Sequence, residues 1–233
     1  ASSGDASDFG DLDSARSGCS SLSNSTRGVI SHGIDGDFNN VIQYVTIGST
    51  GNASDFGDLT VSRVHGTATS STTRGLFASG AISGNTSNVI DYITIGSTGN
   101  ASDFGNLSTT REQGLDGRGS NGTRGVFCGG SSKETPNAGS DNPQNIIEYV
   151  TIANTGNATD FGDLSAVRML TAAVVGGDRL LVTGGSTTES ATNGVNIMEF
   201  ITITSTGNAT DFGDLGTAKV EMAGTSDSHG GLA

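Results

Sequence analysis

The clearest hydrophobic pattern in the chain is a seven-residue run that occurs four times. Each run is rich in Val, Ile, Tyr and Thr and is bounded by Gly, Ser and Asn. This composition is typical of a strand covered on both faces, and nothing comparable appears at helical spacing. The pattern therefore predicts an all-β protein, with strands at VIQYVTI (41–47), VIDYITI (89–95), IIEYVTI (146–152) and IMEFITI (197–203).

A second pattern is a nine-residue phrase centred on Asp-Phe-Gly, which occurs at 4–12, 51–59, 99–107, 156–164 and 207–215. Its phenylalanines are 47, 48, 57 and 51 residues apart, and an arginine or lysine follows each of them by seven residues. Such periods indicate stacked repeat units, so the recurring residues are assigned structural roles. These are Phe9, Phe56, Phe104, Phe161 and Phe212, the aspartates Asp8, Asp55, Asp103, Asp160 and Asp211, and the arginines Arg16, Arg63, Arg111 and Arg168.

Each member of the phrase has an expected role. The phenylalanines are expected to be wedges between units, and the following glycines to permit a bend or bulge. The aspartates are expected to accept turn N–H groups or to pair with a repeated arginine. Calcium is the alternative, although Asp55 and Asp58 supply only two carboxylates and Ca²⁺ takes six to eight oxygen ligands. No other metal site is expected, because His32, His65 and His229 fall at different points of their repeats.

Four short strands fit each repeat. In the second repeat these are 64–71, 73–79, 89–95 and the Asp-Phe-Gly segment, which suits a blade of a β-propeller. We expect one domain over 1–233 with about five four-stranded blades, and an open β-solenoid is the alternative. The last blade would be shared, with segment 4–12 forming a ladder beside 219–233.

The order of residues resembles kelch-type propeller repeats. Cys128-Gly129-Gly130 ends an apolar strand and is followed by Tyr149, Phe161 and Arg168, in the order of that family. Two features depart from it, because the aromatic is never Trp and the first two repeats have Ser31-His32-Gly33 and Ala78-Ser79-Gly80 at the glycine pair. The whole phrase resembles more closely the repeats of large proteins of marine tailed phages, particularly cyanophages. That resemblance implies a virion component such as a fibre or appendage.

Composition excludes some partners. The chain has 24 acidic and 11 basic residues and a net charge of −13, which disfavours binding to a phosphate backbone. It contains no run of 18 apolar residues, so no membrane span is expected.

Residues that do not repeat are the candidates for function, since recognition tends to reside in variable loops on a rigid frame. The loop candidates are Asp35, Asp37, Asn85, Lys133, Glu134, Asn137, Asp141 and Asn142. We expect a non-enzymatic virion module at the virion surface, outside the cell, that contacts other virion proteins or a host-surface glycan; a homo-oligomer is left open. One alternative is a glycan-degrading enzyme that uses the carboxylate pair Asp35 and Asp37 or Glu112 and Asp116. The other is a cellular kelch-type scaffold for protein interactions.

Overall fold

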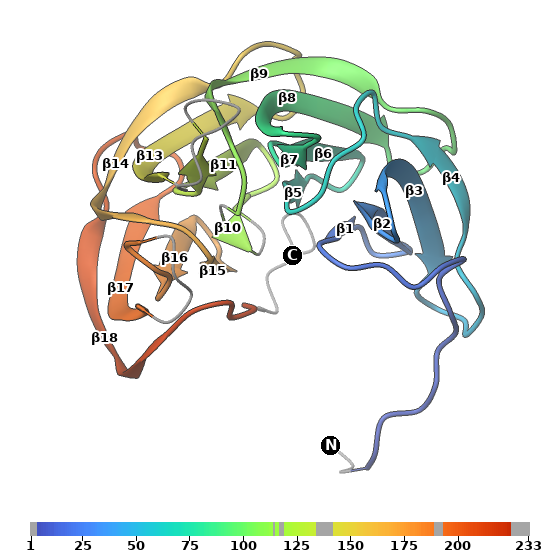
Figure 1. The fold of residues 1–233 in the computed structure, drawn as a ribbon, viewed down its shortest axis with the longest axis horizontal. Coiled ribbons are helices and arrows are strands. Elements are labelled where there is room, and N and C mark those ends of the chain that lie inside the picture. Colours follow the sequence, from blue (N-terminus) through green and yellow to red (C-terminus); the bar gives the residue numbers. More distant parts are fainter. Residues whose placement is uncertain (1–3, 114, 117–118, 134–141, 189–192, 225–233) are drawn as a thin grey trace.

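The computed structural model describes residues 4–113, 115–116, 119–133, 142–188 and 193–224. These residues form four antiparallel sheets placed side by side around a common axis (Figure 1). The prediction of an all-β propeller is confirmed, with four blades where about five were predicted.

Blades 1, 2 and 4 share an order of four strands, and blade 3 has the last three of these strands among the described residues. Blade 1 consists of β1 (Ser20–Ser23), β2 (Arg27–Ile34), β3 (Phe38–Thr46) and β4 (Ser54–Asp58). Blade 2 consists of β5 (Thr67–Ser70), β6 (Arg74–Ala78), β8 (Asn85–Thr94) and β9 (Ser102–Arg111), and β7 (Ala81–Ile82) pairs with β8. Blade 3 consists of β11 (Arg124–Cys128), β13 (Asn142–Thr151) and β14 (Thr159–Arg168), with β12 (Ser131–Ser132) paired to β13. Blade 4 consists of β15 (Thr171–Gly176), β16 (Arg179–Thr183), β17 (Val195–Thr202) and β18 (Thr210–Lys219), and β10 (Leu115–Asp116) runs parallel to β15.

The apolar core lies between the blades. Phe56, Phe104 and Phe161 are each 2% exposed, and each belongs to a cluster that joins its own blade to the next one. Phe56, for example, packs with Ile42 of blade 1 and with Ile93 of blade 2. Each of these rings also meets the aromatic ring of the third strand edge-on, at centroid distances of 5.9–6.0 Å. Stacking of neighbouring blades therefore buries the faces that one blade leaves uncovered.

The Asp-Phe-Gly segment forms a bulge in the outer strand of each blade. In blade 2 the register passes from Ile90 opposite Gly105 to Asp91 opposite Asp103, so Phe104 has no partner and points between the blades. Gly105 has φ = +144°, and a Cβ atom on it would lie 2.4 Å from the carbonyl oxygen of Gly156. Only glycine therefore permits this close approach of two backbones.

Gly-Asn-Ala turns connect each blade to the previous one. Gly99 and Ala101 donate their N–H groups to the carbonyls of Phe56 and Asp58 at 2.7 and 2.8 Å. The Asn100 side chain accepts the N–H of Asp58 at 3.1 Å. The same contacts recur at Gly156-Asn157-Ala158 and at Gly207-Asn208-Ala209.

The predicted ladder between 4–12 and 219–233 is not formed by the part of these segments that the structure describes. Segment 4–12 instead packs on blade 1, where Gly51 and Ala53 donate to the carbonyls of Phe9 and Asp11 at 2.7 and 2.9 Å. These contacts are those that an Asp-Phe-Gly segment makes with the following blade. Residue Glu221, by contrast, donates to Leu170 of blade 4, and Figure 1 shows a gap between β18 and blade 1. Residues 225–233 of the predicted ladder lie outside the described residues.

Candidate functional site

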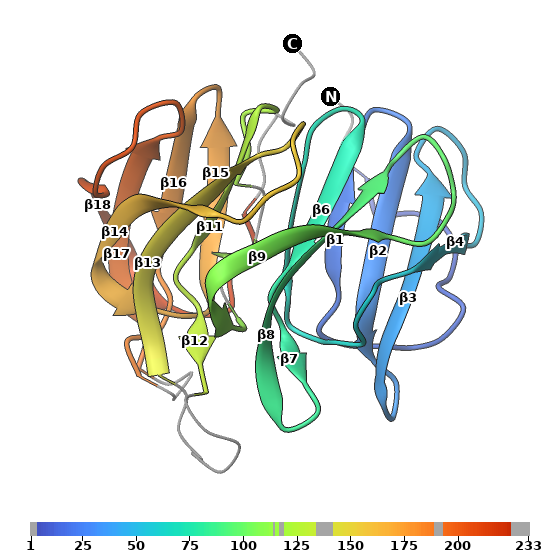
Figure 2. The same cartoon turned by 90° about the horizontal axis from the view of Figure 1, so that it is seen from above.

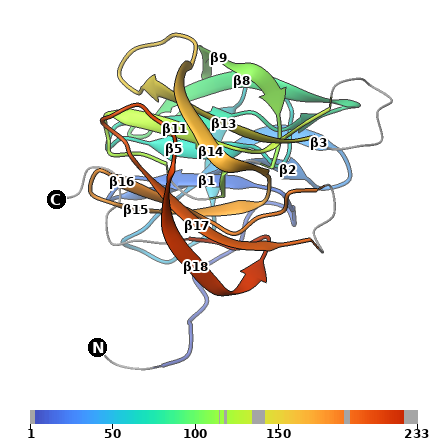
Figure 3. The same ribbon diagram turned by 90° about the vertical axis from the view of Figure 1, so that its left-hand side faces the viewer.

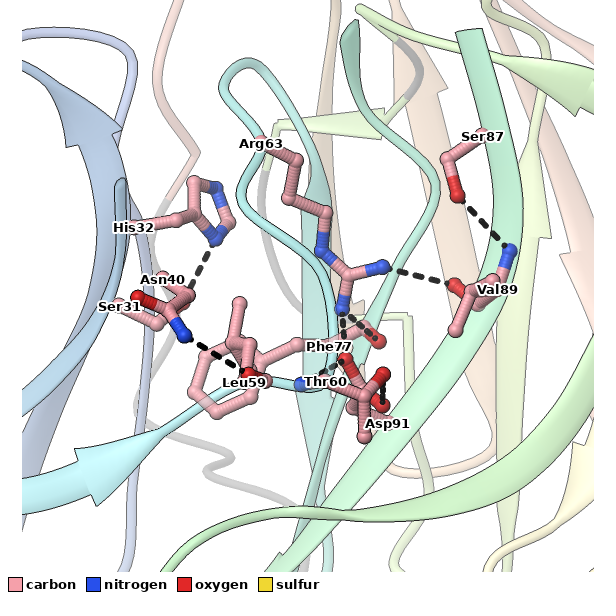
Figure 4. Close-up of polar contacts among 10 residues, drawn as sticks. All are labelled: Ser31, His32, Asn40, Leu59, Thr60, Arg63, Phe77, Ser87, Val89 and Asp91. Carbon is pink, nitrogen blue, oxygen red and sulfur yellow. Dashed lines mark hydrogen bonds and ion pairs between the residues drawn. The ribbon is translucent and has the colours of Figure 1, made fainter. Parts of the chain in front are cut away.

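Buried arginine–carboxylate pairs in blades 2, 3 and 4 join the third strand to an arginine at or just after the end of the outer strand of the preceding blade. Arg63 and Asp91 lie 2.8 Å apart, and both side chains are fully buried. Arg63 also donates to the carbonyls of Val89 and Phe77, and Asp91 accepts both the N–H and the hydroxyl of Thr60 (Figure 4). Burial raises the pKa of Asp91 and lowers that of Arg63 to about 10, the nearby opposite charge acting against each shift. Each charge therefore offsets part of the cost of burying the other.

The pair recurs in the next two blades. Arg111 contacts Glu148 at 2.5 Å, and Arg168 contacts Glu199. The carboxylates also accept the backbone N–H of Ser108 and of Ser165. In blade 1 the corresponding residue is Gln43, and Arg16 contacts Asp13 instead, at 2.5 Å.

Of the two roles predicted for the repeated aspartates, pairing with these arginines is not found among the described residues, because the carboxylates of the third strand occupy the arginines. The other predicted role is found at Asp8, which accepts the N–H of Gly10 at 3.1 Å. The other four aspartates of the phrase are exposed: Asp55, Asp103, Asp160 and Asp211. The sequence analysis missed Asp91, Glu148 and Glu199, although each is an acidic residue in the middle of an otherwise apolar strand. An acidic residue in the middle of a buried strand was the signal that could have predicted the ion pair, because a buried carboxylate requires a cation.

His32 is a second buried polar group. It is fully buried in a left-handed conformation (φ = +47°), and its Nδ1 lies 2.8 Å from the Ser31 hydroxyl. Gly129 and Gly184 hold the same position in blades 3 and 4 with φ near +60°. Burial, together with the charges of Arg63 and His65, lowers the pKa of His32 to about 3.

His32 should make the fold sensitive to acid. The unfolded chain takes up a proton below pH 6.5, whereas the folded chain does so only near pH 3. The free energy of unfolding should therefore fall by about 1.4 kcal/mol for each pH unit across this window. His32→Gly should have a shallower pH slope in urea titrations between pH 6.5 and pH 4. The matched change Ser79→Gly, at the same place in blade 2 (φ = +59°), should keep the wild-type slope; equal slopes in both variants would contradict the assignment.

One polar cluster has no counterpart in the other blades. Glu112 is 3% exposed and stands where blades 2 and 4 have Val64 and Met169. It lies 3.1 Å from Lys133 Nζ and 3.7 Å from His65 Nδ1. Burial raises the pKa of Glu112, but the hydrogen bonds and charges of His65 and Lys133 outweigh burial and hold the pKa below its usual value. Glu112 is therefore an anion, and the partly exposed Lys133 presents a fixed cation beside a loop.

The predicted loop residues lie on connections between second and third strands. Asp35 and Asp37 are exposed between β2 and β3, and Asn85 begins β8. Lys133 and Asn142 bracket the connection between β12 and β13, and Asn142 is exposed. Figure 2 shows the β2–β3 and β7–β8 connections and the neighbouring ends of β12 and β13 at the same edge of the ring, its lower edge in that view. Of the predicted set, Glu134, Asn137 and Asp141 lie outside the described residues.

Two of the carboxylates named for the glycan-degrading alternative bind other groups. The Asp35 carboxylate accepts the hydroxyl of Ser14 at 3.1 Å, and the Glu112 carboxylate is held by Lys133 and His65. The side chain of Asp116 lies outside the described residues. Within the part of the chain that the structure describes, no group of three or more His, Cys, Asp or Glu side chains is placed to share a metal ion. That part also contains no helix long and apolar enough to cross a membrane.

Comparison with known proteins places the fold. The chain matches no protein-family model and no curated protein sequence. Among solved structures it is similar to that of YjhT, a kelch-repeat protein, with a TM-score of 0.65 and 13% identity. The chain has a kelch-like propeller fold. The match covers 79% of this chain and 65% of YjhT. At this level of identity the similarity concerns the fold alone.

Proposed function

We propose that this kelch-like propeller is a non-enzymatic structural and adhesion module of a tailed-phage virion, displayed outside the cell, which binds host-surface glycan or neighbouring virion proteins through its loop edge. The phage assignment is supported by the resemblance of the repeated phrase to repeats of marine phage proteins. Adhesion is supported by the contrast between repeated and non-repeated residues. The repeated side chains are occupied in holding blades together, whereas the non-repeated polar side chains gather at one edge.

The observation that carries the proposal is the cluster of Lys133, Glu112 and His65. Its buried carboxylate fixes a partly exposed lysine ammonium at the edge of the ring to which the connections with Asp35, Asp37 and Asn142 also belong. A fixed cation and several amide and carboxylate groups suit the hydroxyl and acidic groups of a surface polysaccharide. Holding the side chain in advance reduces the entropy lost on binding.

Binding to purified host-surface polysaccharide tests the proposal. We expect Lys133→Ala to weaken binding at least fivefold in a surface-immobilised assay, because the variant loses the fixed cation. Asp55→Asn, an exposed change in β4 away from the loop edge, should bind as the wild type does. The same incubation should release no new reducing ends. Release that Asp35→Asn or Glu112→Gln abolishes would instead support the glycan-degrading enzyme, and equal binding by all variants would contradict the loop edge as the site.

A further inference from the structure

Each blade has two unlike faces. We call the face that carries the Asp-Phe-Gly phenylalanine and is turned to the next blade the outgoing face, and the opposite one the incoming face. In the three interfaces between blades, the outgoing face always meets an incoming face, and the phenylalanine between them is 2% exposed. In all three interfaces, therefore, the surface that covers an outgoing face is the incoming face of the next blade.

The outgoing face of blade 4 is not covered by any described residue. Phe212 is 51% exposed, although its ring meets Phe200 edge-on as in the other blades. Leu181, Met198 and Leu215 are partly exposed, whereas the residues at their positions in the other blades are at most 3% exposed. Figure 3 views the outer edge of blade 4, with β18 running in front of β17. An apolar face of this kind marks a binding surface.

Two cations on this face lack the partners that their equivalents have. Arg27, Arg74 and Arg124 stack on an aromatic ring and donate to the carbonyls of Ile95, Ile152 and Ile203 in the following blade, each at 2.9 Å. Arg179 stacks on Phe200 at 4.2 Å but donates to no such carbonyl among the described residues. Lys219, at the position of Arg63, is exposed and makes no ion pair with a described residue. The face thus presents apolar side chains, an arginine whose equivalents donate to a carbonyl, and a lysine whose equivalents pair with a carboxylate.

A second copy of the chain does not supply the cover. The incoming face that does not meet another blade is that of blade 1. There the N–H groups of Gly51 and Ala53 already donate to the carbonyls of Phe9 and Asp11 of the same chain. Figure 1 also shows that four blades enclose most of the ring, so the gap beside β18 is too small for four more. The matching cover is smaller, namely the second strand, third strand and Gly-Asn-Ala turn of one repeat.

We propose that the outgoing face of blade 4 binds a β-hairpin of this same repeat. Such a hairpin offers an Ile/Val/Phe face to Phe212, a strand-end carbonyl to Arg179 and a mid-strand carboxylate to Lys219. Its turn offers two N–H groups and an asparagine oxygen to the backbone of β18. This is strand complementation, in which main-chain hydrogen bonds give affinity and alternate side chains give specificity. The proposal stands independently of the glycan-binding function.

The test uses the full chain and a labelled synthetic peptide with the sequence of residues 73–101, which contains all of these groups. In fluorescence anisotropy we expect saturable binding, and a peptide with Ile93→Asp and Ile95→Asp should bind at least tenfold more weakly. Phe212→Asp or Arg179→Ala in the protein should weaken binding of the wild-type peptide at least tenfold. The control Val167→Asp, which changes another exposed apolar residue (41%) on blade 3, should not change it.

Three results would overturn the proposal. They are equal binding of the two peptides, binding that Phe212→Asp leaves unchanged while its thermal melt matches the wild type, and absence of binding to the folded wild-type chain. Sedimentation of the chain alone gives a further check. A concentration-dependent dimer that Phe212→Asp abolishes would make a second copy the occupant and would contradict the assignment to a hairpin.

Discussion

Phe104→Ala should lower the free energy of unfolding by about 3–5 kcal/mol, because it leaves a cavity between blades 2 and 3. Phe104 is 2% exposed and packs with Leu76 and Ile90 of its own blade and with Phe127 of the next. The measurement is urea unfolding followed by circular dichroism. Phe212→Ala is the matched control, since it makes the same change at the same place in a blade whose outgoing face is open.

The control should cost about 1 kcal/mol or less, because a half-exposed ring forfeits little burial on truncation. Equal losses in the two variants would show that the phenylalanine stabilises its own blade and not the interface between blades.

Glu148→Leu should also cost about 3–5 kcal/mol, because it leaves the Arg111 guanidinium buried without its anion. The two side chains are 2% and 3% exposed, and burial already lowers the pKa of Arg111 although Glu148 acts to raise it. The double variant Arg111→Met with Glu148→Leu should recover most of the loss, since no charge then remains buried. A double variant as unstable as Glu148→Leu alone would show that the cost comes from packing around the introduced leucine and not from the unpaired charge.

The local pattern of the sequence predicted the parts of the fold that depend on neighbouring residues in the chain. The seven-residue runs became β3, β8, β13 and β17, and the Asp-Phe-Gly phrase became the bulged outer strand. Apolar composition and glycine position determine these features within a few residues. Blade count and chain closure depend on the angle between blades, which no short segment encodes, and for that reason the described parts of 4–12 and 219–233 do not form the predicted ladder.

The candidate site was predicted only in part for a related reason. Lys133 could be chosen because it does not repeat, but its pairing with Glu112 joins a residue that follows β12 to one that follows β9. Asp91, Glu148 and Glu199 were missed because their partners lie 28 to 37 residues away along the chain, and only the fold brings each arginine to its carboxylate. Composition therefore identified which residues are unusual, but not which of them meet.

The Gly-Asn-Ala turns also explain why the repeats tolerate unequal lengths. Each turn binds only the outer strand of the blade before it, through two backbone N–H groups and one asparagine oxygen. Cohesion in such a chain is one-dimensional, so the stability of the whole approximates a sum over adjacent pairs. An insertion at the far edge of one blade then adds only the entropic cost of closing a longer loop, which grows slowly with length. It leaves the interactions between adjacent blades unchanged. This accounts for a step of 57 residues beside one of 48, and it leaves the loop edge free to diversify while the frame stays constant.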